Sequence, residues 1–356
     1  MTISQANNPI GPGYEGVAGT EKRFRDIFRD TLRAEMIRDE DVFLMGEDIS
    51  GGFDKDTKEP LDAWGGPFAA TKGLVQEFGI ERIRDAPISE AGFVGAAVGS
   101  ALTGMRPVVD LMYFDFVTVA FDQLLSNAAK SRYMFGGQTK VPLTLFARSG
   151  AGTGHAAQHS ESFYSMLAHI PGLKVVVPSD PYSVKGLLAA AIRDDDPVFV
   201  VNDKKLINLT GFVPDEEYVI ELGKGRYMRR GADVTLVGMS YTTVVCQKAA
   251  DQLADIGIDA EVVDMMSLSP LGEDILIESV TKTNNVVIVD EDTPRASMSS
   301  EFAAIIADKA FDHLDAPVKR VTAPHSPVPY NRDLEQEFMP QPDDVVGTVK
   351  SLLGRE

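Results

Sequence analysis

Short runs of aliphatic residues alternate along the chain with longer stretches in which apolar positions recur every three or four residues. Such runs, apolar on both faces of a strand and separated by helices, are typical of mostly parallel sheets that helices cover on both sides. The pattern therefore predicts an α/β fold. The strands are expected at VPLTLF, KVVVP, DPVFVV, ADVTLVG, DAEVVD, NNVVIVD and APVKRVT.

The same pattern divides the chain into two parts. Residues 206–230 mix proline, glycine and charged residues between two sets of strand and helix patterns, which indicates a linker. We expect a larger domain over residues 22–205 and a smaller one over 231–356, with a loose tail over 1–21. The length of 356 residues agrees with this division, because it is too long for one ordinary core.

Composition argues against several classes of function. The formal charge of −19 and the isoelectric point near 4.7 disfavour a nucleic-acid ligand, because proteins that bind phosphate backbones present clustered lysine and arginine. The single cysteine, Cys246, permits neither an internal disulfide nor a cysteine metal cluster. The sequence shows no signal-peptide pattern and no apolar segment of membrane-spanning length. We therefore expect a cytoplasmic protein that binds neither nucleic acid nor membrane.

One acidic residue, Glu90, precedes an uncharged run of small and apolar residues. After it, Gly92, Ala96, Ser100 and Gly104 recur every four positions, so a helix here has one face of small side chains. One interpretation is tight helix packing, with the acid placed in the first turn where the helix dipole favours it. The other interpretation is close approach by a flat ligand.

Two further groups of residues follow predicted strands. His155 and His159 lie in a loop rich in glycine and alanine, and loops at the carboxyl ends of parallel strands are where α/β proteins bind ligands. The alternative is a structural role; zinc is not favoured, because no third ligand has suitable spacing. Phe114 and Phe116 have the spacing of one strand face, which suits either core packing or contact with a flat heteroaromatic ligand. The nearby GAGTG does not fit a dinucleotide-binding fingerprint.

Many motifs, in one order, resemble a known family. They are GED, DAPISEAGFVGAAVGSAL, GMRPVVDLMYFDF, NAAKSRYMFGGQ, AAQHSES, HIPGLKVVVPSDPYSVKGLL and IRDDDPV. From about residue 22 to its C-terminus, the chain is similar to the β subunit of the thiamine-diphosphate-dependent component of 2-oxo acid dehydrogenase complexes. The resemblance implies a transketolase-like pyrimidine-binding domain and a smaller transketolase C-terminal-like domain. Further motifs resemble the acetoin dehydrogenase branch of that family; they are DAWGG, DEDTPRASM and TAPHSPVPY.

The resemblance implies roles for several of these residues. Glu90 would hydrogen-bond a ring nitrogen of the cofactor's aminopyrimidine, Ile88 would lie against the cofactor, and Phe116 would pack on the pyrimidine. His159 would face the substrate channel, where it would handle protons or contact the lipoyl group. The chain has no G-D-G motif to bind the diphosphate through Mg²⁺. The resemblance therefore implies an α subunit that supplies this site, with the active site at the α/β interface of an α2β2 tetramer.

Some relatives also bind potassium through backbone carbonyls and carboxylates, and such hard oxygen ligands suit this cation. The resemblance transfers this site to five positions, which makes potassium a further expected cofactor. The positions are Leu143, Ala191, Ile192, Asp194 and Asp196.

The implied reaction is cleavage of acetoin to acetaldehyde, with transfer of the acetyl group to the lipoamide of an acyltransferase core. Glu161 places an acidic group close to His159, which would disfavour an anionic 2-oxo acid and tolerate a neutral acyloin. Three alternatives stay open. They are a β subunit for pyruvate or another 2-oxo acid, a split transketolase-like transferase subunit, and a non-catalytic scaffold subunit.

Overall fold

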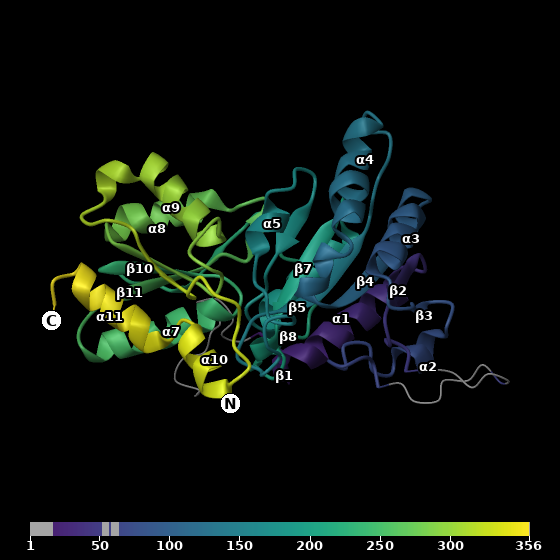
Figure 1. The fold of residues 1–356 in the computed structure, drawn as a ribbon, viewed down its shortest axis with the longest axis horizontal. Helices are drawn as coiled ribbons and strands as arrows, with labels where there is room; N and C mark the ends of the chain where they lie inside the picture. The colour runs from purple at the N-terminus through teal and green to yellow at the C-terminus, as the bar shows by residue number, and fades with distance from the viewer. Residues whose placement is uncertain (1–16, 52–56, 58–63, 356) are drawn as a thin grey trace.

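The computed structural model describes residues 17–51, 57 and 64–355, which form two α/β units (Figure 1). The first unit runs from purple to teal in the figure, and the second runs from green to yellow. Each contains its own mostly parallel sheet, so the predicted α/β class is confirmed. Most of the predicted tail, together with residues 52–56 and 58–63, lies outside the described residues.

The first sheet has the strand order β12-β6-β7-β5-β4-β2-β3. Neighbouring strands are parallel except for β12, which is antiparallel to β6. Because β12 lies beyond the predicted linker, a segment of the second domain completes the sheet of the first. The strands are β2 (Val42–Gly46), β3 (Ile83–Asp85), β4 (Arg106–Tyr113), β5 (Thr144–Ser149), β6 (Lys174–Val176), β7 (Val198–Asp203) and β12 (Ser267–Ser269).

Helices cover both faces of this sheet, as strands without a polar face require. They include α1 (Phe24–Arg38), α2 (Leu74–Phe78), α3 (Glu90–Leu102), α4 (Ala129–Met134), α5 (Tyr164–Ala168) and α6 (Pro181–Arg193). Val108 and Phe146 belong to the apolar core that includes α1 and α6, whereas Val109 and Leu145 belong to the core that includes α3. Adjacent residues of one strand therefore enter different cores, which explains the continuous apolar runs in the sequence.

The second sheet has the order β14-β13-β10-β11-β9, and only β9 runs antiparallel to its neighbour. Its strands are β9 (Arg226–Arg229), β10 (Val234–Gly238), β11 (Ala260–Asp264), β13 (Val286–Asp290) and β14 (Lys319–Thr322). The helices are α7 (Tyr241–Asp255), α8 (Glu273–Thr283), α9 (Met298–Lys309), α10 (Arg332–Phe338) and α11 (Pro342–Leu352). Figure 1 shows α8 and α9 on one side of β10 and β11, with α7 and α11 on the other.

The segment predicted as a linker contains two strands. β8 (Thr210–Pro214) pairs antiparallel with β1 (Gly19–Arg23), and β9 joins the second sheet. The predicted loose tail therefore extends too far, because pairing with β8 fixes the backbone from Gly19 onward.

Arg226 joins the two domains through two acidic side chains. Its guanidinium lies 2.9 Å from a carboxylate oxygen of Asp180, at the start of α6, and 3.0 Å from one of Asp264, at the end of β11. Asp264 is completely buried and Asp180 is 5% exposed. Burial raises the pKa of Asp264, and the charge of Arg226 acts in the opposite direction. The ion pairs therefore stabilise two carboxylates that burial alone would disfavour.

We expect Arg226→Met to lower the free energy of unfolding by about 3–5 kcal/mol, because it leaves buried carboxylates without their cation. The pKa of Asp264 then rises further in the folded state, so the loss grows as pH rises from 5 to 8. Denaturant unfolding at several pH values measures both effects. Arg229→Met is the matched control, since Arg229 lies on the same strand as Arg226 and pairs with Asp251 of α7, which is only partly buried. If both variants lowered the free energy of unfolding by the same small amount, the stabilising role of the Arg226 ion pairs would be contradicted.

Candidate active site

The segments that follow the parallel strands of the first sheet carry most of the predicted site residues. Glu90 lies beyond the end of β3, Phe116 beyond β4, and His159 beyond β5. Because β3, β2, β4 and β5 are parallel neighbours, these segments emerge at one edge of the sheet. This carboxyl edge is where open α/β sheets bind ligands.

Glu90 is the first residue of α3 and is only 7% exposed. A second acid, Glu47, follows β2 nearby. Burial raises the pKa of Glu47, and the charges of Asp48 and then of Glu90 raise it further. A buried carboxyl group beside a second acid suits the sharing of a proton with a bound heterocycle. Ile88, in contrast, is 77% exposed and lies just before the helix.

The small-residue face of α3 is open in this chain. Gly92, Ala96 and Gly99 are exposed, whereas Val94 and Ala97 on the opposite face are buried in the core. The close approach of another helix or of a flat ligand to this face stays a prediction.

The prediction that Phe114 and Phe116 share one strand face is wrong. Met112 has a φ of 64°, outside the extended range, and the residues after β4 form the 3-10 helix η1 (Phe114–Thr118). The two side chains consequently point in different directions. Phe114 is completely buried, whereas Phe116 is half-buried at the carboxyl edge.

An aromatic cluster surrounds Tyr113 at the end of β4. The centroid of its ring lies 4.4 Å from that of His159, 5.2 Å from Phe68 and 5.5 Å from His155. The rings of Phe116 and His159 are 5.4 Å apart and nearly perpendicular, an arrangement that aromatic pairs favour. Two residues predicted independently from the sequence are therefore in contact.

Hydrogen bonds hold residues 150–159, which we call the histidine loop, at its C-terminal end. The Asp115 carboxylate accepts from the backbone N–H of Ser160 at 3.2 Å, and the Lys204 ammonium donates to the carbonyl oxygen of His159. The second carboxylate oxygen of Asp115 is buried and has no hydrogen-bond partner within the described part of the chain. A water molecule or a ligand can supply that missing partner.

The carboxyl edge is rich in acids whose ionisation is disfavoured. Burial raises the pKa of Asp115, and burial followed by Asp115 raises that of Glu161. Burial, followed by Asp290 and Glu161, raises the pKa of Asp292 to about 8. Burial also lowers the pKa of Lys204, against the charges of neighbouring acids. Groups whose pKa is perturbed in this way are typical of functional sites.

We expect Asp292→Asn to stabilise the protein at pH 8 and to have no such effect at pH 4. The protonated form of Asp292 is favoured in the folded state. The wild-type chain therefore loses stability as pH rises from about 4, the pKa of an aspartate in the unfolded chain, through about 8, the pKa of Asp292 in the folded chain. Asparagine cannot ionise and avoids that loss. Unfolding midpoints between pH 4 and 9 measure the difference. A difference that is the same at all pH values would show that ionisation of Asp292 is not its cause.

Sequence reasoning missed Tyr113, Asp115, Lys204 and Asp292. All four occur at or within two residues after the ends of β4, β7 and β13. The carboxyl-end rule, applied to the predicted strands DPVFVV and NNVVIVD, would have found Lys204 and Asp292. Tyr113 and Asp115, in contrast, lie at or just after the end of a strand that was not among those predicted.

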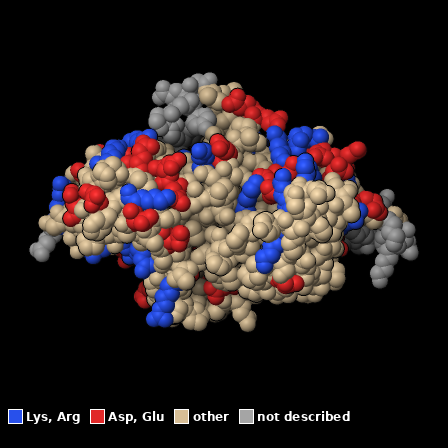
Figure 2. Space-filling model, turned by 90° about the horizontal axis from the view of Figure 1, so that it is seen from above, with Lys and Arg blue, Asp and Glu red and all other residues tan. Residues whose placement is uncertain are grey.

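Charged side chains of both signs are mixed on the surface. Figure 2 shows lysine and arginine interspersed with aspartate and glutamate on the visible face, without a continuous basic tract. No helix in the described part of the chain is long and apolar enough to span a membrane. Among residues 17–51, 57 and 64–355, no three His, Cys, Asp or Glu side chains are grouped so that they could hold a metal ion.

The potassium positions suggested by the resemblance already contact cationic groups of the chain itself. Arg106 donates to the carbonyl oxygens of Ile192 and Asp194 at 3.2 and 2.9 Å. Lys174 lies 2.7 Å from the carboxylate of Asp194, and Asp196 pairs with an arginine at 2.6 Å. The remaining carbonyls, those of Leu143 and Ala191, accept backbone N–H groups. Cationic side chains of the chain thus already contact three of the five positions, Ile192, Asp194 and Asp196, and we derive no role for potassium.

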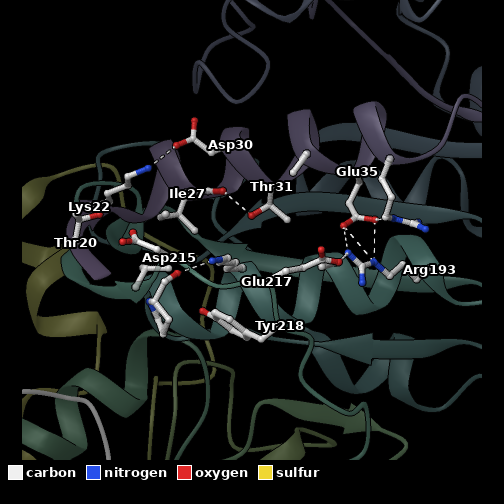
Figure 3. A pocket seen from close by; sticks show the side chains of 16 residues that line it. Thr20, Lys22, Ile27, Asp30, Thr31, Glu35, Arg193, Asp215, Glu217 and Tyr218 are labelled. Carbon is white, nitrogen blue, oxygen red and sulfur yellow. Dashed lines mark hydrogen bonds and ion pairs between the residues drawn. The ribbon is translucent and has the colours of Figure 1, made fainter. Parts of the chain in front are cut away.

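A cavity of about 330 Å³ lies away from these residues, between α1, α6 and the segment after β8 (Figure 3). Its charged side chains are paired: Lys22 with Asp30 at 3.1 Å, and Arg193 with Glu35 at 2.6 Å. Lys185 donates to two backbone carbonyl oxygens of the same segment. None of the predicted site residues lines it, so we assign it no part in the candidate active site.

Comparison with known proteins identifies the family. Residues 20–210 match the transketolase pyrimidine-binding domain, and residues 223–345 match the transketolase C-terminal domain. A relative from Bacillus subtilis (strain 168), named acetoin:2,6-dichlorophenolindophenol oxidoreductase subunit beta, is 50% identical over 92% of this chain and 96% of its own length. The chain belongs to this family of transketolase-like β subunits. The resemblance inferred from the sequence motifs is thereby confirmed.

Other members of the family carry two kinds of name. A protein from Cupriavidus necator, with the same acetoin name, is 44% identical over 91% of this chain and 95% of its own length. The pyruvate dehydrogenase E1 component subunit beta of Rickettsia felis is 39% identical over 92% of this chain and 97% of its own length. The chain thus belongs to a family of thiamine-diphosphate-dependent oxidoreductases, and the naming of these relatives as β subunits implies an α partner.

One solved structure shares the whole fold of the β subunit. It is described as "Split gene transketolase, inactive beta4 tetramer" and matches with a TM-score of 0.72, covering 95% of this chain and 99% of that one. The sequences are 22% identical, so this likeness supports the fold alone.

Proposed function

We propose that the chain is the β subunit of a thiamine-diphosphate-dependent acetoin dehydrogenase. In this proposal, the enzyme cleaves acetoin to acetaldehyde and transfers the acetyl group to lipoamide on an acyltransferase core. The 50% identity to the acetoin-named relative from Bacillus subtilis, over nearly the full length of both chains, is the observation that carries it.

The residues at the carboxyl edge fit the aminopyrimidine part of the cofactor. Glu90 offers a buried carboxyl group, and Phe116 offers a half-buried ring beside His159. We propose that Glu90 hydrogen-bonds a ring nitrogen and exchanges a proton there, while Phe116 and the exposed Ile88 pack against the ring. Bound thiamine diphosphate supplies the nucleophilic carbon that carries the two-carbon fragment.

His159 is proposed to act on the substrate side of the same edge. Its ring packs edge-on against Tyr113, and Lys204 holds its backbone carbonyl. An imidazole fixed in this way can donate or accept a proton at the substrate oxygen or at the lipoyl sulfur.

The charges around His159 favour a neutral substrate. The Asp115 carboxylate accepts from the backbone N–H groups of Ser160 and Glu161, directly after His159, and the Lys204 ammonium donates to the carbonyl oxygen of His159. The carboxylate of a 2-oxo acid needs a cationic partner when it is desolvated, whereas acetoin carries no charge.

The remaining parts of the cofactor site are assigned to the partner. The chain has no G-D-G motif, so we propose that an α subunit holds the diphosphate and Mg²⁺ in an α2β2 tetramer. Lipoamide would reach the active site from a separate acyltransferase.

The test is to co-express the chain with its α subunit, add thiamine diphosphate and Mg²⁺, and compare acetoin with pyruvate using 2,6-dichlorophenolindophenol as electron acceptor. Faster reduction with acetoin, together with release of acetaldehyde, is the expected result. Faster reduction with pyruvate, together with release of carbon dioxide, would assign the chain to the 2-oxo acid branch. Inactivity with both, combined with two-carbon transfer to an aldose, would favour the split-transketolase alternative.

A further inference from the structure

The second domain holds the histidine loop through a buried carboxylate. Glu335, on α10, is 1% exposed although glutamate is rarely buried. Its carboxylate oxygens accept three successive backbone N–H groups, from Gly152 at 2.7 Å, Thr153 at 3.2 Å and Gly154 at 2.9 Å. Hydrogen bonds to an ionised acceptor are about twice as strong as those between neutral groups. The loop is therefore held from outside its own domain.

A second acid extends this contact by one residue. The backbone N–H of Ala151 donates to the carboxylate of Glu291, which follows β13 in the second domain. Four consecutive N–H groups of the loop thus bind carboxylates of the other domain. Backbone that converges on an anion in this way forms a concave nest, a geometry that relies on residues with positive φ.

The glycines of the loop make that geometry possible. Gly150, Gly152 and Gly154 have φ values of 90°, 93° and 76°, which side chains other than glycine rarely adopt. A Cβ on Gly152 would lie 2.7 Å from the sulfur of Met339, just beyond α10. The GAGTG sequence, which does not fit a dinucleotide fingerprint, fits an intramolecular carboxylate instead.

The held backbone leads directly to the two histidines. The hydroxyl of Thr153 is 2.8 Å from Nδ1 of His155, and the ring of His155 packs on Tyr113. Tyr113 in turn contacts the ring of His159. A displacement of residues 152–154 would therefore be transmitted to His159 through rings in contact and through the four intervening residues 155–158.

We propose that Glu335 is a positioning residue: the second domain fixes the histidine loop through this carboxylate and thereby sets the position of His159 for the reaction. The inference rests on the proposed role of His159 in catalysis. It adds a function for the second domain within the chain itself, separate from any contact with a partner subunit. Small displacements at a reacting centre have large kinetic effects, so a side chain that touches no substrate can still control turnover.

The test uses Glu335→Gln in the complete α/β complex. Glutamine keeps the shape of the side chain, but its amide NH₂ cannot accept a hydrogen bond and faces backbone donors. Glu337→Gln, at an exposed position on the same helix, is the matched control. We expect Glu335→Gln to lower kcat about tenfold with little change in KM, for whichever donor the complex oxidises.

A double-mutant cycle separates positioning from a general structural role. If Glu335 acts through His159, the same substitution in a His159→Asn background has little additional effect on kcat. Multiplicative losses in the double variant, or an unchanged kcat in Glu335→Gln, would overturn the proposal.

Amide hydrogen exchange provides a readout that does not depend on activity. Exchange at residues 151–154 is expected to be faster in Glu335→Gln than in Glu337→Gln, whether or not acetoin is the substrate. Unchanged exchange would contradict the proposal that Glu335 fixes the histidine loop. Faster exchange in a complex that is inactive with acetoin would support the fixing of the histidine loop by Glu335 and reject the proposed function.

Discussion

Glu90→Gln is expected to lower turnover of the α/β complex about a thousandfold while the complex remains assembled. Glutamine has nearly the size of glutamate, so the buried position at the start of α3 stays filled. The amide cannot exchange a proton with the aminopyrimidine, which is the role proposed for this carboxyl group. Steady-state turnover with saturating thiamine diphosphate measures the loss, and light scattering measures assembly.

Glu81→Gln is the control for this substitution, because Glu81 is exposed near the strand that precedes α3. It should keep full turnover. If Glu90→Gln retained more than about a tenth of wild-type turnover, general acid–base catalysis by Glu90 would be excluded, since such a group contributes at least about a hundredfold. The acid would then have the structural role of favouring the helix dipole, and the scaffold alternative would gain support.

His159→Asn is expected to lower acetyl transfer to a lipoyl acceptor about a hundredfold. Asparagine retains the backbone carbonyl that accepts from Lys204, but its side-chain amide cannot transfer a proton as an imidazole does. Reduction of an artificial acceptor should fall less, because that acceptor takes electrons without accepting the acetyl group. Parallel assays with lipoamide and with the dye distinguish the two steps.

His313→Asn is the matched control, since His313 lies exposed in the 3-10 helix η4 (Phe311–His313) of the second domain. It is expected to leave both assays unchanged. Equal losses in the lipoamide and dye assays for His159→Asn would place the histidine before the transfer step. Unchanged rates in both assays would remove His159 from the mechanism.

Local patterns predicted the elements of the fold well. The apolar runs correspond to strands such as β5 and β7, which helices cover on both faces. A strand covered in this way needs apolar side chains at consecutive positions, so the local sequence shows it directly. The start of α3 at Glu90 likewise follows from the local sequence. The path after β4 does not, because the positive φ of Met112 turns the chain before Phe116, and methionine gives no local signal for that conformation.

Contacts between distant segments were beyond prediction from local pattern. Glu335 and Gly152 are 183 residues apart, and Glu291 and Ala151 are 140 apart. Hydrophobic periodicity reports which side chains are buried, but it does not state which buried polar groups meet. The same limit applies to the acids around Asp292, whose raised pKa depends on residues from both domains.

The pairing of β12 with β6 limits how this protein can be recombined with its relatives. Residues 267–269 complete the sheet of the first domain, with Ser269 bonded to the backbone oxygen of Leu173 at 2.9 Å. A chimera joined in the segment between the domains would therefore pair β6 of one parent with β12 of the other. A fragment ending at residue 230 would leave the edge of β6 open to association with other chains. Each domain therefore has its own sheet, but an exchange of the second domain between relatives also exchanges a strand of the first domain's sheet.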